Sequence, residues 1–143
     1  MLNYYGDTGV REICHAVKTD KRKKAVHEIA KYLISLEIVD QKSILIPVPQ
    51  HYGYADYTKE ICNEISAVSG AKVCDILKCI PHESIFIQKK MGYKPSINYF
   101  IDGKIPDGKL YFVDNVIATG ISYNEANKLF GYNLIPFVYA KDE

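Results

Sequence analysis

A predicted strand, a Thr-Gly turn and a predicted helix follow one another between residues 109 and 130, and this succession constrains the fold most. Residues 109–114 are apolar enough for a buried strand, and residues 122–130 have a helical pattern that Gly131 would end. Strands that alternate with helices predict an α/β fold with a central, mostly parallel sheet flanked by helices. The other predicted strands span residues 43–48, 72–77 and 134–139.

Two amphipathic helices are predicted on either side of the first strand. One starts at Thr19 or Asp20 and carries apolar residues at helical spacing as far as Ile34, with lysines on its outer face. The other runs from Tyr57, and Gly70 stands where such a helix would end.

A long insertion separates the second and third predicted strands. Two short β-like pieces around a tip that contains lysines and a glycine predict a hairpin excursion at residues 84–101. Connections of this length inside a compact domain are usually functional.

The composition favours a single domain, residues 1–143, without a nucleic-acid or membrane partner. With 18 Lys and Arg against 17 Asp and Glu, the net charge of +1 is too small to drive binding to nucleic acid or membranes. The N-terminus lacks the layout of a signal peptide, and no apolar stretch is long enough to span a bilayer. Cys14, Cys62, Cys74 and Cys79 match no metal or disulfide spacing, so we expect a cytoplasmic protein.

The turn that follows residues 109–114 is predicted to bind phosphate. Its backbone N–H groups can point in one direction, beside the positive end of the following helix and two hydroxyl groups. A structural alternative is that Ser122 and Glu125 form a capping box and that Gly120 only permits the turn. The two roles are compatible, and we expect both. The turn consists of Ala118, Thr119, Gly120, Ile121 and Ser122.

Asp114 is predicted to lie at the end of a buried strand, where its charge is costly unless hydrogen-bond donors meet it. It precedes the phosphate turn by a few residues. The vicinal hydroxyl groups of a ribose whose 5-phosphate occupies the turn are therefore a natural partner for this carboxylate.

Residues 112–122, FVDNVIATGIS, resemble the phosphoribosyl-diphosphate (PRPP) signature of the type I phosphoribosyltransferases. That signature has hydrophobic residues, two acids, two variable positions, then Thr-Gly, one further residue and Thr or Ser. Asn115 stands in place of the second acid. The resemblance implies that Asp114 and Asn115 hold the ribose hydroxyls and that residues 118–122 hold the 5-phosphate.

From about Cys14 onward the layout is similar to the ComF-like branch of this family, in which a Pro-Val-Pro strand end precedes the pyrophosphate loop. The resemblance implies a small hood or hairpin insertion and a pyrophosphate loop at Pro49, Gln50 and His51. The basic residues of that branch have no counterpart here before Lys59.

The resemblance also implies that a mobile loop with Lys89, Lys90 and Lys94 closes over the diphosphate. The alternative is that these lysines are ordinary solvated surface. Beside the pyrophosphate loop, tyrosines are candidates for stacking on a base, with partial burial in the core as the alternative. These tyrosines are Tyr52, Tyr54 and Tyr57.

The resemblance implies a Mg²⁺-dependent enzyme that moves ribose-5-phosphate from PRPP to a nitrogen acceptor, nucleobase-like or an amine, and releases pyrophosphate. Mg²⁺ would be held mainly through PRPP and not directly by side chains. The alternative is a non-catalytic PRPP- or nucleotide-binding regulatory or accessory protein, which Asn115 and the missing basic residues near Gln50 favour. The sequence leaves open the acceptor and the oligomeric state, a homodimer included.

Overall fold

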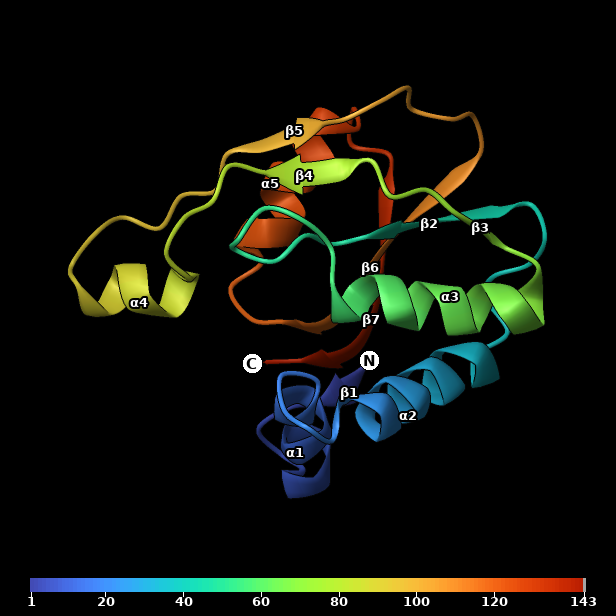
Figure 1. The fold of residues 1–143 in the computed structure, drawn as a ribbon, viewed down its shortest axis with the longest axis horizontal. Helices are drawn as coiled ribbons and strands as arrows, with labels where there is room; N and C mark the ends of the chain where they lie inside the picture. Colours follow the sequence, from blue (N-terminus) through green and yellow to red (C-terminus); the bar gives the residue numbers. More distant parts are fainter. Residues whose placement is uncertain (143) are drawn as a thin grey trace.

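The computed structural model describes residues 1–142, which form an α/β fold around a five-stranded, parallel sheet (Figure 1). The strand order is β1-β7-β6-β2-β3, so β6 lies in the centre of the sheet. Because all strands run the same way, the carboxyl ends of β2, β6 and β7 meet at one edge, where ligands bind in open α/β sheets. The strands are β1 (Leu2–Asn3), β2 (Ser43–Pro47), β3 (Lys72–Val73), β6 (Lys109–Ile117) and β7 (Leu134–Lys141).

Helices cover both faces of the sheet (Figure 1). Successive side chains of β6 point to opposite faces, so Tyr111 and Val113 pack with α1, α2 and α3, whereas Phe112 packs with α5. Burial on both faces explains why the central strands have continuous apolar sequences. The helices are α1 (Thr8–Ala16), α2 (Arg22–Ser35), α3 (Tyr57–Ser69), α4 (Ile85–Lys90) and α5 (Ile121–Leu129).

The predicted α/β architecture and most of its elements are confirmed. The strands β2, β6 and β7 cover three of the predicted strands, and α2, α3 and α5 cover the predicted helices. Gly70 ends α3 in the left-handed conformation, with a φ of 77°. A glycine adopts this conformation without the steric cost that a Cβ would bring.

The predicted strand at 72–77 is wrong in its second half. The Cys74 N–H makes the last ladder bond, to the Leu45 carbonyl, and the chain then turns, with the Ile76 N–H donating back to the Cys74 carbonyl. Leu77–Cys79 (β4) then pairs with Tyr99–Ile101 (β5) in a separate antiparallel hairpin. Leu77 is still buried, in the core beneath this hairpin, so the apolar pattern continues across the break.

The excursion predicted at 84–101 is present with different bounds. Its two paired arms are β4 and β5, and α4 lies between them where a β-like piece was predicted. Ser84 favours the helix, because its Oγ accepts a hydrogen bond from the Ile87 N–H at 3.2 Å. The helix α4 stands away from the sheet, on the side where the strands end (Figure 1).

The N-terminal segment forms two elements that the sequence pattern did not predict. The two-residue strand β1 pairs with β7 at the sheet edge, and α1 begins after Asp7, whose Oδ1 accepts the Gly9 N–H at 2.8 Å. A two-residue strand is too short to show any periodicity. Among residues 1–142, no helix is both long and apolar enough to cross a membrane.

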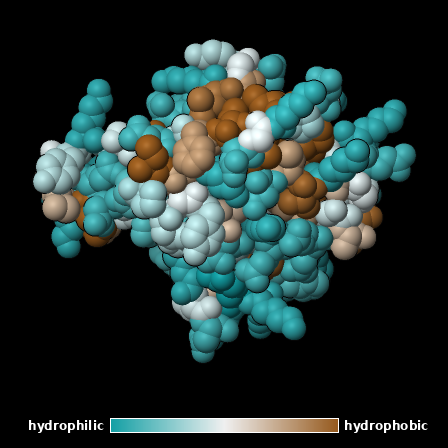
Figure 2. All heavy atoms as spheres, turned by 45° about the horizontal axis from the view of Figure 1, so that its top comes forward, coloured by the Kyte–Doolittle hydropathy of each residue, from teal (hydrophilic) through white to brown (hydrophobic). Residues whose placement is uncertain are grey.

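The face that carries the β4–β5 hairpin is partly apolar. Figure 2 shows apolar side chains gathered mostly in the upper half of this view, with polar side chains over the lower half. Ile80 and Phe100 of the hairpin region and Phe86 of α4 are exposed. Phe86 also borders the cavities at the carboxyl edge of the sheet, so the excursion lies next to the candidate site.

Candidate functional site

Two adjoining cavities lie beyond the carboxyl ends of β2, β6 and β7. One, of about 440 Å³, is lined by the turn 118–122 and by Lys89. The other, of about 370 Å³, is lined by the loop after β2 and by Lys18. Asp114, Ser122 and Asp142 line both cavities, which therefore form one candidate site. A larger hollow of about 940 Å³ lies between α1 and the start of α2, but it contains none of the predicted site residues.

Asp114 lies at the boundary between the two cavities. The strand β6 continues to Ile117, so Asp114 lies within the strand, opposite Val138 of β7, and not at its end as predicted. Its Oδ1 accepts the Asn115 N–H at 2.8 Å. Burial raises the pKa of Asp114 to about 7, although this hydrogen bond and the charge of Lys18 act in the opposite direction. The carboxyl group thus changes charge near neutral pH, as groups at functional sites often do.

Asn115 joins β6 to the helices on the other face of the sheet. Its side chain is buried, and its Nδ2 donates to the Cys14 carbonyl of α1 at 3.0 Å. Its Oδ1 accepts the Tyr57 hydroxyl of α3 at 3.3 Å and the Val116 N–H at 2.9 Å. Both ends of the amide are therefore engaged with the protein. Of the two residues predicted to hold ribose, Asp114 lines both cavities, whereas Asn115 lines the 370 Å³ cavity only.

The turn 118–122 leads directly into α5. Gly120 is the residue before the helix and has a φ of 80°, a conformation that favours glycine. The first helical hydrogen bond runs from the Asn124 N–H to the Gly120 carbonyl at 2.8 Å. The N–H groups of the first turn have no partner inside the helix, and that of Ile121 is met weakly by Thr119 Oγ1 at 3.3 Å. The start of α5 thus presents backbone donors to the 440 Å³ cavity.

The predicted capping box of Ser122 and Glu125 is wrong. The N-cap is Gly120, which has no side chain, and no side-chain hydrogen bond caps α5. The Glu125 carboxylate instead accepts a hydrogen bond from Lys128 at 3.0 Å. The helix therefore begins two residues earlier than the capping pattern requires, and Ser122 lies in its first turn, where it lines both cavities.

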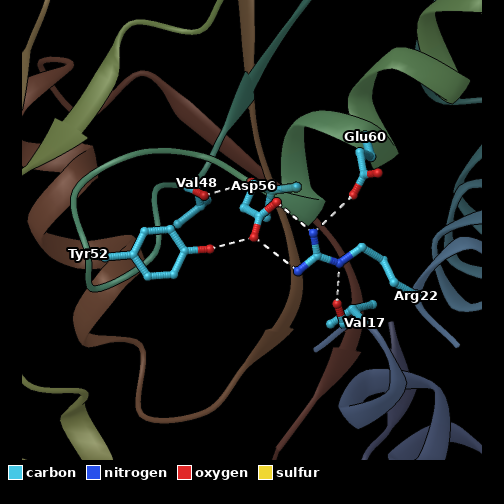
Figure 3. A network of polar contacts seen from close by, with 7 residues as sticks. Val17, Arg22, Val48, Tyr52, Asp56 and Glu60 are labelled. Carbon is cyan, nitrogen blue, oxygen red and sulfur yellow. Dashed lines mark hydrogen bonds and ion pairs between the residues drawn. The ribbon is translucent and has the colours of Figure 1, made fainter. Parts of the chain in front are cut away.

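The loop after β2 is fixed by a network of polar contacts (Figure 3). The guanidinium of Arg22 donates two hydrogen bonds to the Asp56 carboxylate, at 2.7 and 3.0 Å, and a third, from Nε, to the Val17 carbonyl at 2.7 Å. Tyr52 donates its hydroxyl to Asp56 at 2.6 Å. Burial alone would raise the pKa of Asp56, but the hydrogen bonds from Tyr52 and Arg22 outweigh it and lower the pKa. This loop therefore has its shape before any ligand binds.

The predicted pyrophosphate loop lies beside this network. Pro49, Gln50 and His51 line the 370 Å³ cavity together with Asp114. The Gln50 N–H donates to the Tyr54 carbonyl at 2.9 Å, and a ring nitrogen of His51 contacts the His82 carbonyl at 3.2 Å. The structure thus brings the loop after β2 and the strand β6 to one cavity, as predicted from the ends of parallel strands.

The three tyrosines near this loop lie in different environments. Tyr57 borders the 370 Å³ cavity but is buried, with its hydroxyl bonded to Asn115, so little of its ring is open to stacking. Tyr52 is engaged with Asp56, and its ring lies edge-on to that of Tyr54, with 4.9 Å between the ring centroids. Tyr54 is the most exposed of the three, so it is the one that a planar ligand can reach most easily.

The lysines predicted for the mobile loop do not converge on one point. Lys89 lines the 440 Å³ cavity together with the turn 118–122. Lys94 lines a separate hollow beside α5, and Lys90 is exposed on α4 without lining either cavity. The arrangement therefore places one of these three side chains at the candidate site.

Two charged residues at the site were missed by the sequence analysis. Lys18, in the turn between α1 and α2, lines the 370 Å³ cavity with Gln50, and its charge acts on Asp114. Asp142 directly follows β7, and its N–H donates to the Ile117 carbonyl at 2.8 Å. The rule that parallel strands end at the site could have found Asp142, whereas no local signal marks Lys18.

Within residues 1–142, no group of three or more His, Cys, Asp or Glu side chains is placed to hold a metal ion. A comparison with protein-family models finds no match to this chain, and a search of curated proteins finds no significant match either.

Proposed function

We propose that this chain is a Mg²⁺-dependent phosphoribosyltransferase of the type I family, which transfers ribose-5-phosphate from PRPP to a nitrogen acceptor. The observation that carries the proposal is that Asp114 and the turn 118–122 line one cavity beyond the central strand β6. The resemblance of residues 112–122 to the PRPP signature gives this pair of features its chemical interpretation.

The turn 118–122 holds the 5-phosphate in this proposal. Backbone N–H groups at the start of α5 and the positive end of its dipole face the cavity. The dipole supplies about 1–2 kcal/mol in a partly buried geometry, and each charge-assisted hydrogen bond roughly 1.5–3 kcal/mol. Lys89, which comes from α4 and lines the same cavity, adds a positive charge. A phosphate monoester is therefore held without an arginine in the turn.

Asp114 accepts hydrogen bonds from the ribose hydroxyls. Asp114 lines both cavities, so a ribose that joins the phosphate turn to the loop after β2 passes beside it. Hydrogen-bond donors stabilise the charged form of a carboxyl group. Binding of the sugar therefore draws the pKa of Asp114 down from about 7 and fixes the residue as a carboxylate.

The diphosphate lies against the loop after β2, where Lys18 replaces the basic residues that this loop lacks. Lys18 shares the cavity with Pro49, Gln50 and His51, although it comes from the turn between α1 and α2. Mg²⁺ keeps several waters and binds substrate phosphates readily, so in this proposal it is held mainly through the oxygen atoms of PRPP. When bound, Mg²⁺ would neutralise the charge that develops on the diphosphate.

The reaction breaks the bond between ribose C1 and the diphosphate oxygen, whose electron pair leaves with pyrophosphate. The acceptor nitrogen then bonds to C1 and gives up a proton to solvent or to the leaving pyrophosphate. Because the transition state resembles an oxocarbenium ion, the tasks of the chain are to position the ribose and to stabilise charge. Asp114, held at the cavity floor, lies where it can do both.

A second candidate is a non-catalytic protein that binds PRPP or a nucleotide. The observation that favours it is that both ends of the Asn115 amide are used to join β6 to α1 and α3. The site then has a single acid where the family signature has two. A screen for pyrophosphate release from PRPP with purines, pyrimidines and small amines distinguishes the two candidates. Release with some acceptor supports the enzyme, whereas PRPP binding without release supports the second candidate.

The phosphate turn is tested with Gly120→Val and a matched control, Gly131→Val at the other end of α5. Both glycines have positive φ values, 80° and 64°, so both variants bear a similar local strain. In Gly120→Val the side chain occupies the space in which backbone and phosphate must approach. We expect PRPP binding measured by calorimetry to weaken about 100-fold, or about 2.8 kcal/mol, while the control binds normally. If folded Gly120→Val binds PRPP like the wild type, the phosphate turn is misplaced.

A further inference from the structure

Asp142 has a carboxylate oxygen for which the described part of the chain provides no partner. Its Oδ1 is buried, and no hydrogen-bond donor of residues 1–142 reaches it. A carboxylate accepts hydrogen bonds and donates none. Leaving such an acceptor unmet costs about 1–3 kcal/mol, more for a charged group. The residue as a whole is partly exposed and lines both cavities of the candidate site, so rotation of its carboxylate can bring the unmet oxygen to a donor on a bound molecule.

Asp142 is placed to meet a different part of the ligand from Asp114. In the ladder between β6 and β7, Asp114 lies opposite Val138, and Asp142 comes four residues later in the chain. At the rise of a β-strand this separation is about 13 Å between the backbones. Two carboxylates so far apart cannot grip the same pair of vicinal hydroxyls. Asp142 therefore does not replace the second acid of the PRPP signature.

Residues of the N-terminal segment lie near Asp142 at the candidate site. Its charge contributes to the raised pKa values of Tyr4, which follows β1, and of Cys14 in α1, so Asp142 lies near both residues. Tyr5 lines one cavity with it and Tyr4 lines the other. The N-terminal segment and the residue after β7 thus form a wall with aromatic side chains and one unmet hydrogen-bond acceptor.

We infer that Asp142 selects the nitrogen acceptor of the proposed transferase by accepting a hydrogen bond from an N–H group of that molecule. The acceptor is then a heterocycle or amine that carries an N–H donor in addition to the reacting nitrogen, and it carries no carboxylate. A carboxylate on the acceptor would face Asp142 and Asp114 in the same cavities, where like charges repel. This inference rests on the proposed function and names its substrate class.

The experiment compares matched ligands on wild type and on Asp142→Asn. Nicotinamide and nicotinate differ by an amide against a carboxylate, and adenine and purine differ by one amino group. Each is titrated into the protein with PRPP and Mg²⁺ present, and again into the protein alone, by ligand-observed NMR. A site built to accept a hydrogen bond discriminates strongly against an analogue without the donor. We expect the wild type to favour the N–H donor of each pair by about tenfold. Asp142→Asn should reduce this preference to about twofold, because a neutral amide oxygen accepts a hydrogen bond more weakly than a carboxylate.

Asp107→Asn provides the control, because it removes the same charge from an exposed residue outside both cavities. It should keep the wild-type preference. PRPP binding, measured separately, should be equal in the wild type and in Asp142→Asn. If the wild type does not bind PRPP, the proposed function fails, and the titrations of the protein alone still decide the role of Asp142. An unchanged preference in Asp142→Asn, or binding of no N–H donor to the wild type, overturns the inference.

Discussion

Two groups of polar residues lie at the carboxyl edge of the sheet, and they differ in how far the protein itself satisfies them. The closed group, Arg22, Tyr52 and Asp56, fixes the loop after β2 through hydrogen bonds between 2.6 and 3.0 Å (Figure 3). The open group is Asp114, the turn 118–122 and Asp142. In it, Asp142 Oδ1 has no partner among the described residues, and the Ile121 N–H has one weak contact.

The pKa values of one carboxyl group from each group express this difference. Burial tends to raise both values. For Asp56 the hydrogen bonds from Tyr52 and Arg22 prevail, and the pKa falls below its usual value. For Asp114 burial prevails, and the pKa rises to about 7. The closed group thus completes the fold, whereas the open group has hydrogen-bonding capacity that a ligand can use.

The largest effect on stability is expected when a buried side chain loses a hydrogen bond that it makes in the wild type. In Asn115→Asp a carboxylate replaces the amide whose Nδ2 donates to the Cys14 carbonyl at 3.0 Å. The new group cannot donate, and the side chain is 5% exposed, so little water reaches it. We expect the free energy of unfolding to fall by about 3 kcal/mol, as measured by chemical denaturation at pH 7.

Asn63→Asp is the control for this variant, because Asn63 is exposed on α3. Its free energy of unfolding should stay within about 0.5 kcal/mol of the wild-type value. A different outcome for Asn115→Asp would be informative. Wild-type stability together with tighter Mg²⁺-dependent PRPP binding would show that position 115 serves as the second acid of the PRPP signature.

A smaller effect on stability is expected when Arg22, which joins the members of the closed group, is replaced. Arg22→Met keeps the length of the side chain and removes its three hydrogen bonds, including the pair to Asp56. The side chains of Arg22 and Asp56 are 33% and 30% exposed, so solvent screens their attraction. We therefore expect a loss of about 2 kcal/mol in the free energy of unfolding.

Hydrogen exchange adds a local measurement for Arg22→Met. The amides of Gly53 and Tyr54 should exchange faster, because the loop after β2 loses its attachment to α2. Lys23→Met, an exposed neighbour on the same helix, should change neither quantity. If exchange in the loop is the same in both variants, the network does not fix the loop.

Most of the fold could be predicted from the sequence because its central elements have long apolar patterns. The strands β6 and β7 and the helices α2 and α3 are examples. The break between β3 and β4 could not be predicted, because it depends on strand pairing: β3 pairs with β2, whereas β4 pairs with β5 in a separate hairpin. Leu77 is buried although it lies beyond the break, so the hydrophobic pattern of the sequence does not show where β3 ends.

The candidate site could be predicted where its parts are contiguous in the chain. Asp114 and the turn 118–122 follow one another, and strand and helix patterns on either side place them together. The engagement of Asn115 could not be predicted, since its partner Cys14 is 101 residues away in the sequence. Lys18 was missed for the same reason, because an exposed lysine in a turn is distinguished by its spatial neighbours alone.

The smallest effect concerns the pH dependence of stability and sharpens the contrast between Asp56 and Asp114. A carboxyl group whose pKa is raised in the folded state holds a proton that the unfolded chain has already lost. The contribution of Asp114 to the free energy of unfolding therefore falls as the pH rises from about 4 to about 7, and it is constant above that range. Asp56, with a lowered pKa, acts in the opposite sense, and its contribution is lost as the pH falls below 4.

Asp114→Asn removes the first of these two effects. One pKa unit corresponds to about 1.4 kcal/mol, and because the carboxyl group still opens onto the cavities we expect a net change of about 1 kcal/mol. Between pH 5 and pH 8 the wild type should lose this much stability relative to Asp114→Asn, while Asp107→Asn should follow the wild type. Denaturation curves at both pH values measure the difference. Parallel curves for the wild type and Asp114→Asn would mean that Asp114 is solvated in the free protein, and its place in the open group would then be wrong.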